Sequence, residues 1–190
     1  SQTPEKPADH SIDTATGQEA PAEISSARVK KIFTDIAWKY ERFNKLSSFG
    51  QYRSWLRTLI DKSPITSETL MLDIAGGTGD VTITACERKQ PKHIILSDYT
   101  PAMLEVAQSR LDAGEANGVP VELAVVDGQD IPYGNESFDV ITMSYGIRNM
   151  PERERALSEM YRVLKPGGAL CVLEFSTPPN PLMRLGYNLY

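Results

Sequence analysis

Five short apolar segments alternate with helical patterns along residues 65–190, and this alternation restricts the fold more than any other feature of the sequence. Mostly apolar strands that alternate with helices are typical of a parallel sheet covered by helices on both faces. We therefore expect an α/β fold with a mostly parallel sheet. The expected strands are 69–75, 93–98, 121–126, 138–144 and 169–175, and the expected helices are about 79–89, 101–113 and 152–164.

The first 64 residues differ from the rest. Residues 1–24 are rich in Pro, Ala, Ser, Thr, Glu and Gln, with almost no large apolar side chain, so we expect a disordered tail. Apolar residues then recur at helical spacing in two stretches, and Pro64 ends the second. We expect a helical cap over residues 25–64 and a core domain over residues 65–190. The helices are indicated by Val29, Ile32, Phe33, Ile36, Ala37 and Tyr40, and by Tyr52, Trp55, Leu56, Leu59 and Ile60.

Charge and composition argue against several functions. The net charge of −5 disfavours binding of nucleic acid by bulk electrostatics. Cys86 and Cys171 fall in an expected helix and an expected strand, so we interpret them as reduced core residues of a cytoplasmic protein. With only His10 and His93, the sequence offers no metal cluster of His and Cys and no evident histidine base. No apolar run is long enough to cross a bilayer.

Basic residues nevertheless concentrate between positions 28 and 57. Such a cluster is either a solvated helix face or a surface that contacts an anionic membrane, and both interpretations stay open. The cluster consists of Arg28, Lys30, Lys31, Lys39, Arg42, Lys45, Arg53 and Arg57.

The segment LDIAGGTGD, residues 72–80, places an apolar strand directly before a glycine turn and a helix. Glycines let a backbone approach a ligand, and a helix N-terminus offers free N–H groups. The dinucleotide fingerprint fails because Thr82 occupies its third glycine position, and no P-loop sequence is present. Asp73 at the strand end would repel a pyrophosphate and attract a cation, which favours S-adenosylmethionine; the alternative is a carboxylate that caps the helix. The glycines of this expected site are Gly76, Gly77 and Gly79.

Acidic residues also follow the second and third expected strands. Asp98 can accept hydrogen bonds from the ribose hydroxyls of a nucleoside, or it can cap the helix that begins at Pro101. Asp127 and Gly128 can reach an adenine edge, whereas Asp130 belongs to the turn before Pro132. All of these positions lie at carboxyl ends of strands, where open α/β sheets bind their ligands.

The chain resembles class I methyltransferases, and more narrowly the family that C-methylates the quinol ring in ubiquinone and menaquinone synthesis. The resemblance covers about residues 28–190. It is carried by RVLKPGGALCVLEFS at 162–176, by LDIAGGTGD and by SYGIRN at 144–149. The N-terminal sequence KYERFN is a looser match, and Tyr52 stands where the family often has histidine. The stretch FGQYRSW is closer to menaquinone-type members.

This resemblance implies a Rossmann-like sheet with an N-terminal helical cap, and it adds residues to the cofactor site. Tyr40 and Lys39 would lie on a helix that folds over S-adenosylmethionine, although Tyr40 also fits core packing. The family fold has two further strands, so the chain is expected to be truncated, with an open edge at its fifth strand. The cofactor residues implied by resemblance are Tyr40, Thr78, Asp98, Tyr99, Asp127, Gly128 and Ser144.

The loop at 144–149 carries an arginine and an amide where a turn would need neither. A quinol carbon becomes a good nucleophile when a neighbouring hydroxyl ionises, and Arg148 can stabilise that phenolate although it stays protonated itself. Asn149 can hold the second ring oxygen or cap the helix at Pro151, and Arg148 can also be a plain surface residue. Tyr145 is expected to line the substrate site.

The remaining expectations concern partners and polar contacts. A prenylated, lipid-like quinol is the expected substrate, with peripheral contact at the inner face of the membrane and a homodimer as the expected assembly. Neither a metal nor nucleic acid is expected. Arg162 and Glu174 are interpreted as internal polar contacts outside the site.

Overall fold

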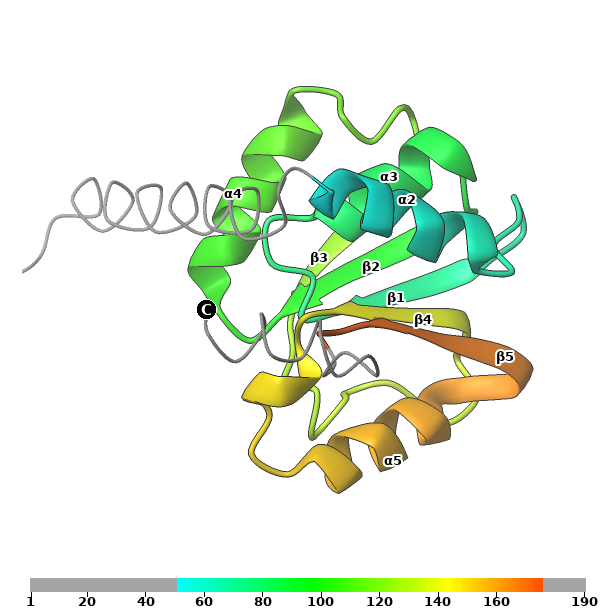
Figure 1. The fold of residues 1–190 in the computed structure, drawn as a ribbon, viewed down its shortest axis with the longest axis vertical. Helices are drawn as coiled ribbons and strands as arrows, with labels where there is room; N and C mark the ends of the chain where they lie inside the picture. The colour runs from blue at the N-terminus through cyan, green and yellow to red at the C-terminus, as the bar shows by residue number, and fades with distance from the viewer. Residues whose placement is uncertain (1–50, 176–190) are drawn as a thin grey trace, which may run out of the picture.

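The computed structural model describes residues 51–175. Its five strands form one sheet in the order β3-β2-β1-β4-β5, and all four pairings are parallel (Figure 1). The α/β class and the parallel sheet predicted from the sequence are confirmed. The strands are β1 (Leu70–Ile74), β2 (His93–Asp98), β3 (Val121–Val125), β4 (Phe138–Ser144) and β5 (Leu164–Leu173).

Helices cover both faces of this sheet, as the apolar strands require. Figure 1 shows α2, α3 and α4 on one side and α5 on the other. The helix α2 comes from the expected cap region and ends just before Pro64, as predicted. The helices are α2 (Tyr52–Lys62), α3 (Asp80–Arg88), α4 (Pro101–Asp112), the short 3-10 helix η1 (Ile147–Asn149) and α5 (Arg153–Val163).

The core has a layer on each side of the sheet. On the α2 and α3 side, Leu56 and Ile60 of α2 pack in one cluster with Met71 of β1, so α2 shares the core of the sheet. On the α5 side, Met160 packs in a cluster with Leu72. Adjacent residues of β1 thus face opposite layers, as the period of two of a strand dictates. Cys86 is fully buried and Cys171 partly buried, and both are free thiols.

The fifth strand departs from the prediction. We expected Lys165 to Gly168 to form a turn between the last helix and a strand starting at 169, but β5 already begins at Leu164. Leu164 pairs with Phe138, and the register then shifts before Ala169. Glycine permits this irregular pairing, because a Cβ on Gly168 would lie 2.8 Å from the Asp139 carbonyl oxygen.

Several expectations fall outside the described residues. They are the tail 1–24, the first helix with Lys39 and Tyr40, most of the basic cluster, and the segment 178–190. Between residues 51 and 175, no helix has the length and apolar character needed to cross a membrane.

Candidate functional site

The loop between β1 and α3 is built from backbone conformations that few residues adopt. Ala75, Gly77 and Gly79 have φ values of 53°, 57° and 89°. The Gly76 N–H donates to the Ser97 carbonyl at 2.8 Å, and the Gly77 N–H donates to Asp98 Oδ2 at 2.9 Å. The loop is therefore held against the carboxyl end of β2, and the positive φ angles at 77 and 79 favour glycine there.

Asp73 lies beneath this loop rather than in a ligand-facing position. Its side chain is fully buried, and its two oxygens accept hydrogen bonds from Thr82 Oγ1 and Thr142 Oγ1, each at 2.7 Å. A Cβ on Gly76 would lie 2.9 Å from Asp73 Oδ2, so glycine lets the loop rest on the carboxylate. Asp73 does not line the cavity described below, and we expect its negative charge to act on a ligand across the glycine loop.

Burial raises the pKa of Asp73 to about 6, against an ordinary value of 3.8, despite the two threonine hydrogen bonds. A folded-state pKa above the unfolded one favours folding at pH values below 3.8, and this advantage is lost as the pH rises through about 6. At neutral pH the charged carboxylate thus costs up to about 3 kcal/mol of stability.

Asp73→Asn is expected to raise the free energy of unfolding at pH 7 by about 1–3 kcal/mol, because it removes the buried charge. The gain should vanish near pH 4, where Asp73 is protonated in the folded wild type. Affinity for S-adenosylmethionine should fall about tenfold, since the negative potential under the loop is lost. Chemical unfolding at both pH values and calorimetry with the cofactor measure the two effects.

Asp139→Asn is the control, because it should change the free energy of unfolding at pH 7 in the opposite direction. Partial burial raises the pKa of Asp139, but hydrogen bonds from Lys165 and from the Leu70 N–H outweigh this and lower it overall. Loss of this carboxylate should therefore destabilise the protein at pH 7. Equal stability losses in both variants would contradict the assignment for Asp73.

A cavity of about 510 Å³ opens beside the glycine loop, at the carboxyl ends of β1 to β4. That volume lies in the range of small-molecule and cofactor sites. Eight of the predicted site residues line it, whereas Asp73, Gly76, Thr78, Gly79 and Arg148 do not. The predicted residues in the lining are Gly77, Asp98, Tyr99, Asp127, Gly128, Ser144, Tyr145 and Asn149.

The chemistry of the lining fits a cofactor that carries positive charge and lacks phosphate. Two carboxylates, Asp98 and Asp127, face this cavity, and none of its lining residues is Lys, Arg or His. Ser144 Oγ is buried without a hydrogen-bond partner in the described structure, so the cavity offers a polar group that a ligand could satisfy. These features agree with the sulfonium and ammonium groups of S-adenosylmethionine.

Asp98 has the acceptor capacity that a ribose diol requires. Its Oδ2 accepts the Gly77 N–H, and its Oδ1 accepts the Thr100 N–H at 2.8 Å. A carboxylate has about four acceptor sites, so both oxygens can accept further bonds. The alternative, that Asp98 is the N-cap of the next helix, is wrong, because Thr100 is the N-cap residue of α4 and Asp98 accepts the N–H of that residue.

Asp127 and Gly128 follow β3 in a short turn. Asp127 Oδ1 accepts hydrogen bonds from the Gln129 N–H at 2.9 Å and from Gln129 Nε2 at 3.1 Å. These bonds hold the pKa of Asp127 below its ordinary value, so its charge is kept. Asp130 pairs with Asp127 through the backbone and belongs to the turn, as predicted.

The loop after β4 brings an aromatic ring and a cation to the edge of the cavity. Tyr145 has a φ of 55° and is buried. Its ring lies 4.6 Å from that of Phe175, and the Arg148 guanidinium carbon lies 5.4 Å from the Tyr145 ring centroid. Gly146 makes this loop fit the glycine loop, because a Cβ there would lie 2.8 Å from Ala75 Cβ.

Arg148 pairs with a residue that was not expected at this site. Its Nη1 donates to Glu174 Oε1 in an ion pair, so Glu174 belongs to this region rather than to the scaffold. The signal was present, since Glu174 directly follows β5 and the carboxyl ends of parallel strands share one edge. Arg162 is structural, as predicted: it bonds Glu159 and the carbonyls of Ile131 and Tyr133.

Asn149 lines the cavity but does not cap a helix. It closes η1, in which its N–H donates to the Gly146 carbonyl at 3.0 Å. The helix α5 begins at Arg153 with Glu152 as its N-cap residue, so the capping alternative for Asn149 is wrong. The ligand-facing role considered for Asn149 stays a prediction, consistent with its place in the cavity lining.

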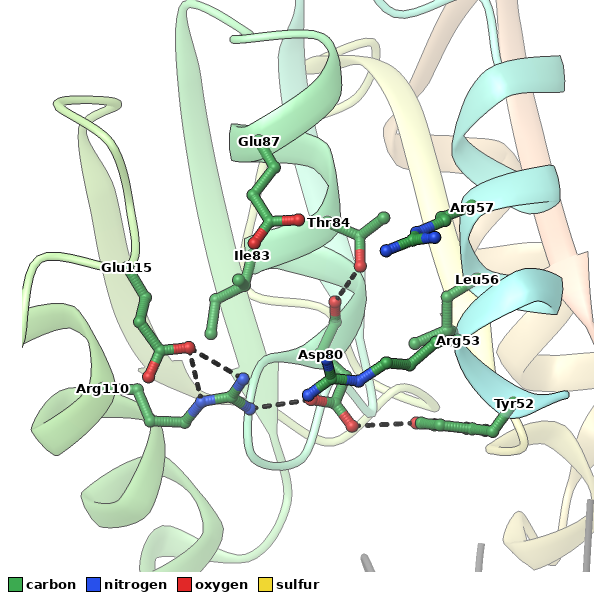
Figure 2. Close-up of a pocket in the computed structure, with 10 residues that line it drawn as sticks. All are labelled: Tyr52, Arg53, Leu56, Arg57, Asp80, Ile83, Thr84, Glu87, Arg110 and Glu115. Carbon is green, nitrogen blue, oxygen red and sulfur yellow. Dashed lines mark hydrogen bonds and ion pairs between the residues drawn. The ribbon is translucent and has the colours of Figure 1, made fainter. Parts of the chain in front are cut away.

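A second pocket, of about 280 Å³, lies between α2, α3 and the end of α4 (Figure 2). Figure 2 shows a chain of polar contacts across it: Asp80 accepts from the Tyr52 hydroxyl at 3.1 Å and from Arg110 at 2.8 Å. The Tyr52 ring also stacks on that of Tyr145, with centroids 6.0 Å apart. No predicted site residue lines this pocket. We interpret the hydrogen bonds across it as contacts that position α2 beside the glycine loop.

Comparison with known proteins identifies relatives along most of the sequence. The model of the ubiE/COQ5 methyltransferase family matches residues 22–190. Ubiquinone/menaquinone biosynthesis C-methyltransferase UbiE of Hahella chejuensis is 37% identical over 174 residues, which are 91% of this chain and 70% of that protein. The protein of the same name in Francisella tularensis subsp. novicida is 40% identical over 173 residues, 90% of this chain and 69% of the relative.

Solved structures share the fold. The YcgJ protein of Bacillus subtilis matches with a TM-score of 0.60 and 27% identity, over 72% of this chain and 56% of that one. A SAM-dependent methyltransferase of Thermotoga maritima matches with a TM-score of 0.59 and 27% identity, over 84% and 67%. The chain thus spans little more than half of the YcgJ chain. Its sheet is the Rossmann-like sheet of class I methyltransferases.

Proposed function

Because this chain belongs to the ubiE/COQ5 methyltransferase family, we propose that it transfers a methyl group to a ring carbon of a prenylated quinol. The substrate is of the demethylmenaquinol or 2-polyprenyl-6-methoxy-benzoquinol type. The cofactor, S-adenosylmethionine, follows from the family and from the structural relatives. The observation that carries the proposal is the acidic cavity with Tyr145 and Asn149 at its rim and Arg148 beside them.

Residues at the strand ends would hold the cofactor. Asp98 would bind the ribose hydroxyls, Asp127 and Gly128 the adenine edge, and Ser144 Oγ a polar group of the amino-acid portion. When bound, S-adenosylmethionine supplies an electrophilic methyl group on a sulfonium. The protein contributes alignment and exclusion of water.

Substrate activation is assigned to the loop after β4. A phenol has a pKa of ~10 and is mostly protonated at neutral pH. A drop of ~2 units in that pKa corresponds to roughly 2.7 kcal/mol, which one well-placed guanidinium can supply in a dry site. Arg148 would bond the ionised oxygen, Asn149 the second ring oxygen, and Tyr145 would pack on the ring. Glu174 offsets part of the charge of Arg148. The effect of Arg148 on the phenol pKa therefore depends on a direct hydrogen bond to the quinol oxygen.

The test is a methyl-transfer assay with labelled S-adenosylmethionine and short-chain analogues of demethylmenaquinol and demethoxyubiquinol, run side by side. We expect ring methylation of at least one, with the demethylmenaquinol analogue favoured. The matched control is the oxidised quinone of each analogue, which has no hydroxyl to ionise and should not react. Cofactor binding without any methylation would instead indicate another small-molecule substrate or a non-catalytic binding subunit.

The lipid-like substrate has a consequence for location. We propose that the protein acts in the cytoplasm and meets its quinol at the inner face of the membrane, where Arg53 and Arg57 of the basic cluster would face anionic lipid. Both arginines are exposed on α2.

A further inference from the structure

The end of β5 lies directly beside the substrate loop. Ser144 pairs with Leu173 across β4 and β5, and the Tyr145 N–H donates to the Leu173 carbonyl at 2.8 Å. The next residue, Glu174, is thereby placed next to the loop that carries Arg148. This placement results from the sheet register, so it does not depend on a flexible connection.

Glu174 holds both the cation and the neighbouring aromatic residue. Its Oε1 accepts from Arg148 Nη1 and from the Phe175 N–H, the latter at 2.9 Å. Arg148 lies over two rings, with its guanidinium carbon 5.4 Å from the Tyr145 centroid and 5.3 Å from that of Phe175. One carboxylate oxygen therefore holds the guanidinium beside the neighbouring Tyr145 and Phe175 rings, where cation–π attraction adds to the ion pair.

The two oxygens of Glu174 differ in their contacts within the described residues. Oε2 is buried and has no hydrogen-bond partner in the described structure. A buried acceptor without a partner costs stability. A carboxylate is also a far weaker base than a phenolate, so full removal of the quinol proton by Glu174 would be strongly uphill. A role in placing Arg148 accounts for the contacts of Glu174 without requiring it to act as the base.

We propose that Glu174 is a positioning residue of the methyl-transfer site, which orients the Arg148 guanidinium toward the quinol oxygen. The inference rests on the proposed quinol methylation. Because Glu174 acts through Arg148, its loss should affect quinol turnover and leave cofactor binding unchanged.

The test begins with Glu174→Gln, which keeps an oxygen acceptor and removes the charge. We expect kcat for the demethylmenaquinol analogue to fall roughly 10- to 100-fold, the order expected when a catalytic group is displaced by up to about 1 Å. The dissociation constant for S-adenosylmethionine, measured by calorimetry, should change less than about twofold. Glu174→Asp, which retains the charge, should recover part of the rate.

A double-mutant cycle separates positioning from an independent role. In an Arg148→Ala background, Glu174→Gln should cause less than about twofold further loss, because its partner is already absent. Independent, multiplying effects of the two substitutions on kcat would overturn the proposal.

The matched control is Asp61→Asn, which breaks the ion pair of Asp61 with Arg88 on the surface of α2 and α3, away from the cavity. This variant should leave kcat unchanged.

A further measurement does not require the quinol to be the substrate. The Nε–H resonance of Arg148, assigned with Arg148→Lys, should show a restricted side chain in the wild type and a mobile one in Glu174→Gln. An equally restricted Arg148 in both would refute the positioning role. If Arg148 becomes mobile but the wild type methylates no quinol, the proposed function fails and the positioning role is retained. Thermal melting of Glu174→Gln and Glu174→Asp checks that both variants are folded.

Discussion

Arg148→Ala should lower kcat for quinol methylation about 100- to 1000-fold, the loss seen when one donor to a developing oxyanion is removed. The guanidinium lies over the Tyr145 ring, and Tyr145 and Asn149 line the cavity. Arg148 itself does not line the cavity, so S-adenosylmethionine should still bind with an affinity within about threefold of the wild type. Single-turnover kinetics and calorimetry measure the two quantities separately.

Two further variants test whether the loss of kcat comes from the missing hydrogen bonds of Arg148. Arg148→Lys keeps the charge but loses the planar fork, and it should retain an intermediate rate if direct hydrogen bonding matters. Arg88→Ala removes an arginine from a comparable ion pair on the surface of α3 and should have no effect on turnover. Near-normal methylation by Arg148→Ala would exclude Arg148 as the group that stabilises the phenolate.

Asp98→Ala should weaken S-adenosylmethionine binding about 100-fold, or roughly 2.7 kcal/mol. The substitution removes the acceptor expected for the ribose hydroxyls. It also leaves the Gly77 and Thr100 N–H groups without their acceptor, so the glycine loop loses its contact with the end of β2. The loss should appear in the dissociation constant and in KM for the cofactor, with kcat at saturation much less affected.

Asp98→Asn should give a smaller loss, because one amide oxygen can still accept one of the two backbone N–H groups. Asp112→Ala is the control, since Asp112 ends α4 and accepts a bond only from Gln108. Unchanged cofactor affinity in Asp98→Ala would show that this cavity is not the methyl-donor site.

The sheet could be predicted because buried parallel strands are nearly continuous apolar runs. The boundaries of β2 and β4 agree with the sequence pattern, and the strand-end rule correctly brought Asp98, Asp127 and Ser144 to one cavity. The start of β5 at Leu164 was missed because Pro and Gly ordinarily indicate a turn, and only tertiary pairing with Phe138 overrides that preference.

The burial of a side chain and the identity of its hydrogen-bond partners could not be predicted from apolar runs and strand ends. Asp73 is at a strand end, as expected, but it is fully buried, and its hydrogen-bond donors are two threonines 9 and 69 residues away in the chain. The pair of Arg148 and Glu174 joins residues 26 apart; the position of Glu174 directly after β5 indicates the shared edge of the sheet, but not which side chain it contacts there. Both contacts arise from the sheet order, which the sequence implies only in outline.

The close fit of Gly146 against Ala75 has a practical consequence for chimeric enzymes. Replacing the 144–149 loop with that of a relative, in order to change quinol preference, also changes a surface that packs against Ala75 at the start of the glycine loop. A donor loop with any side chain at position 146 would clash with Ala75, which leads into the glycine turn. Affinity for the cofactor should then fall together with the change in substrate preference. The two loops should therefore be exchanged as one module, with positions 75 and 146 drawn from the same parent.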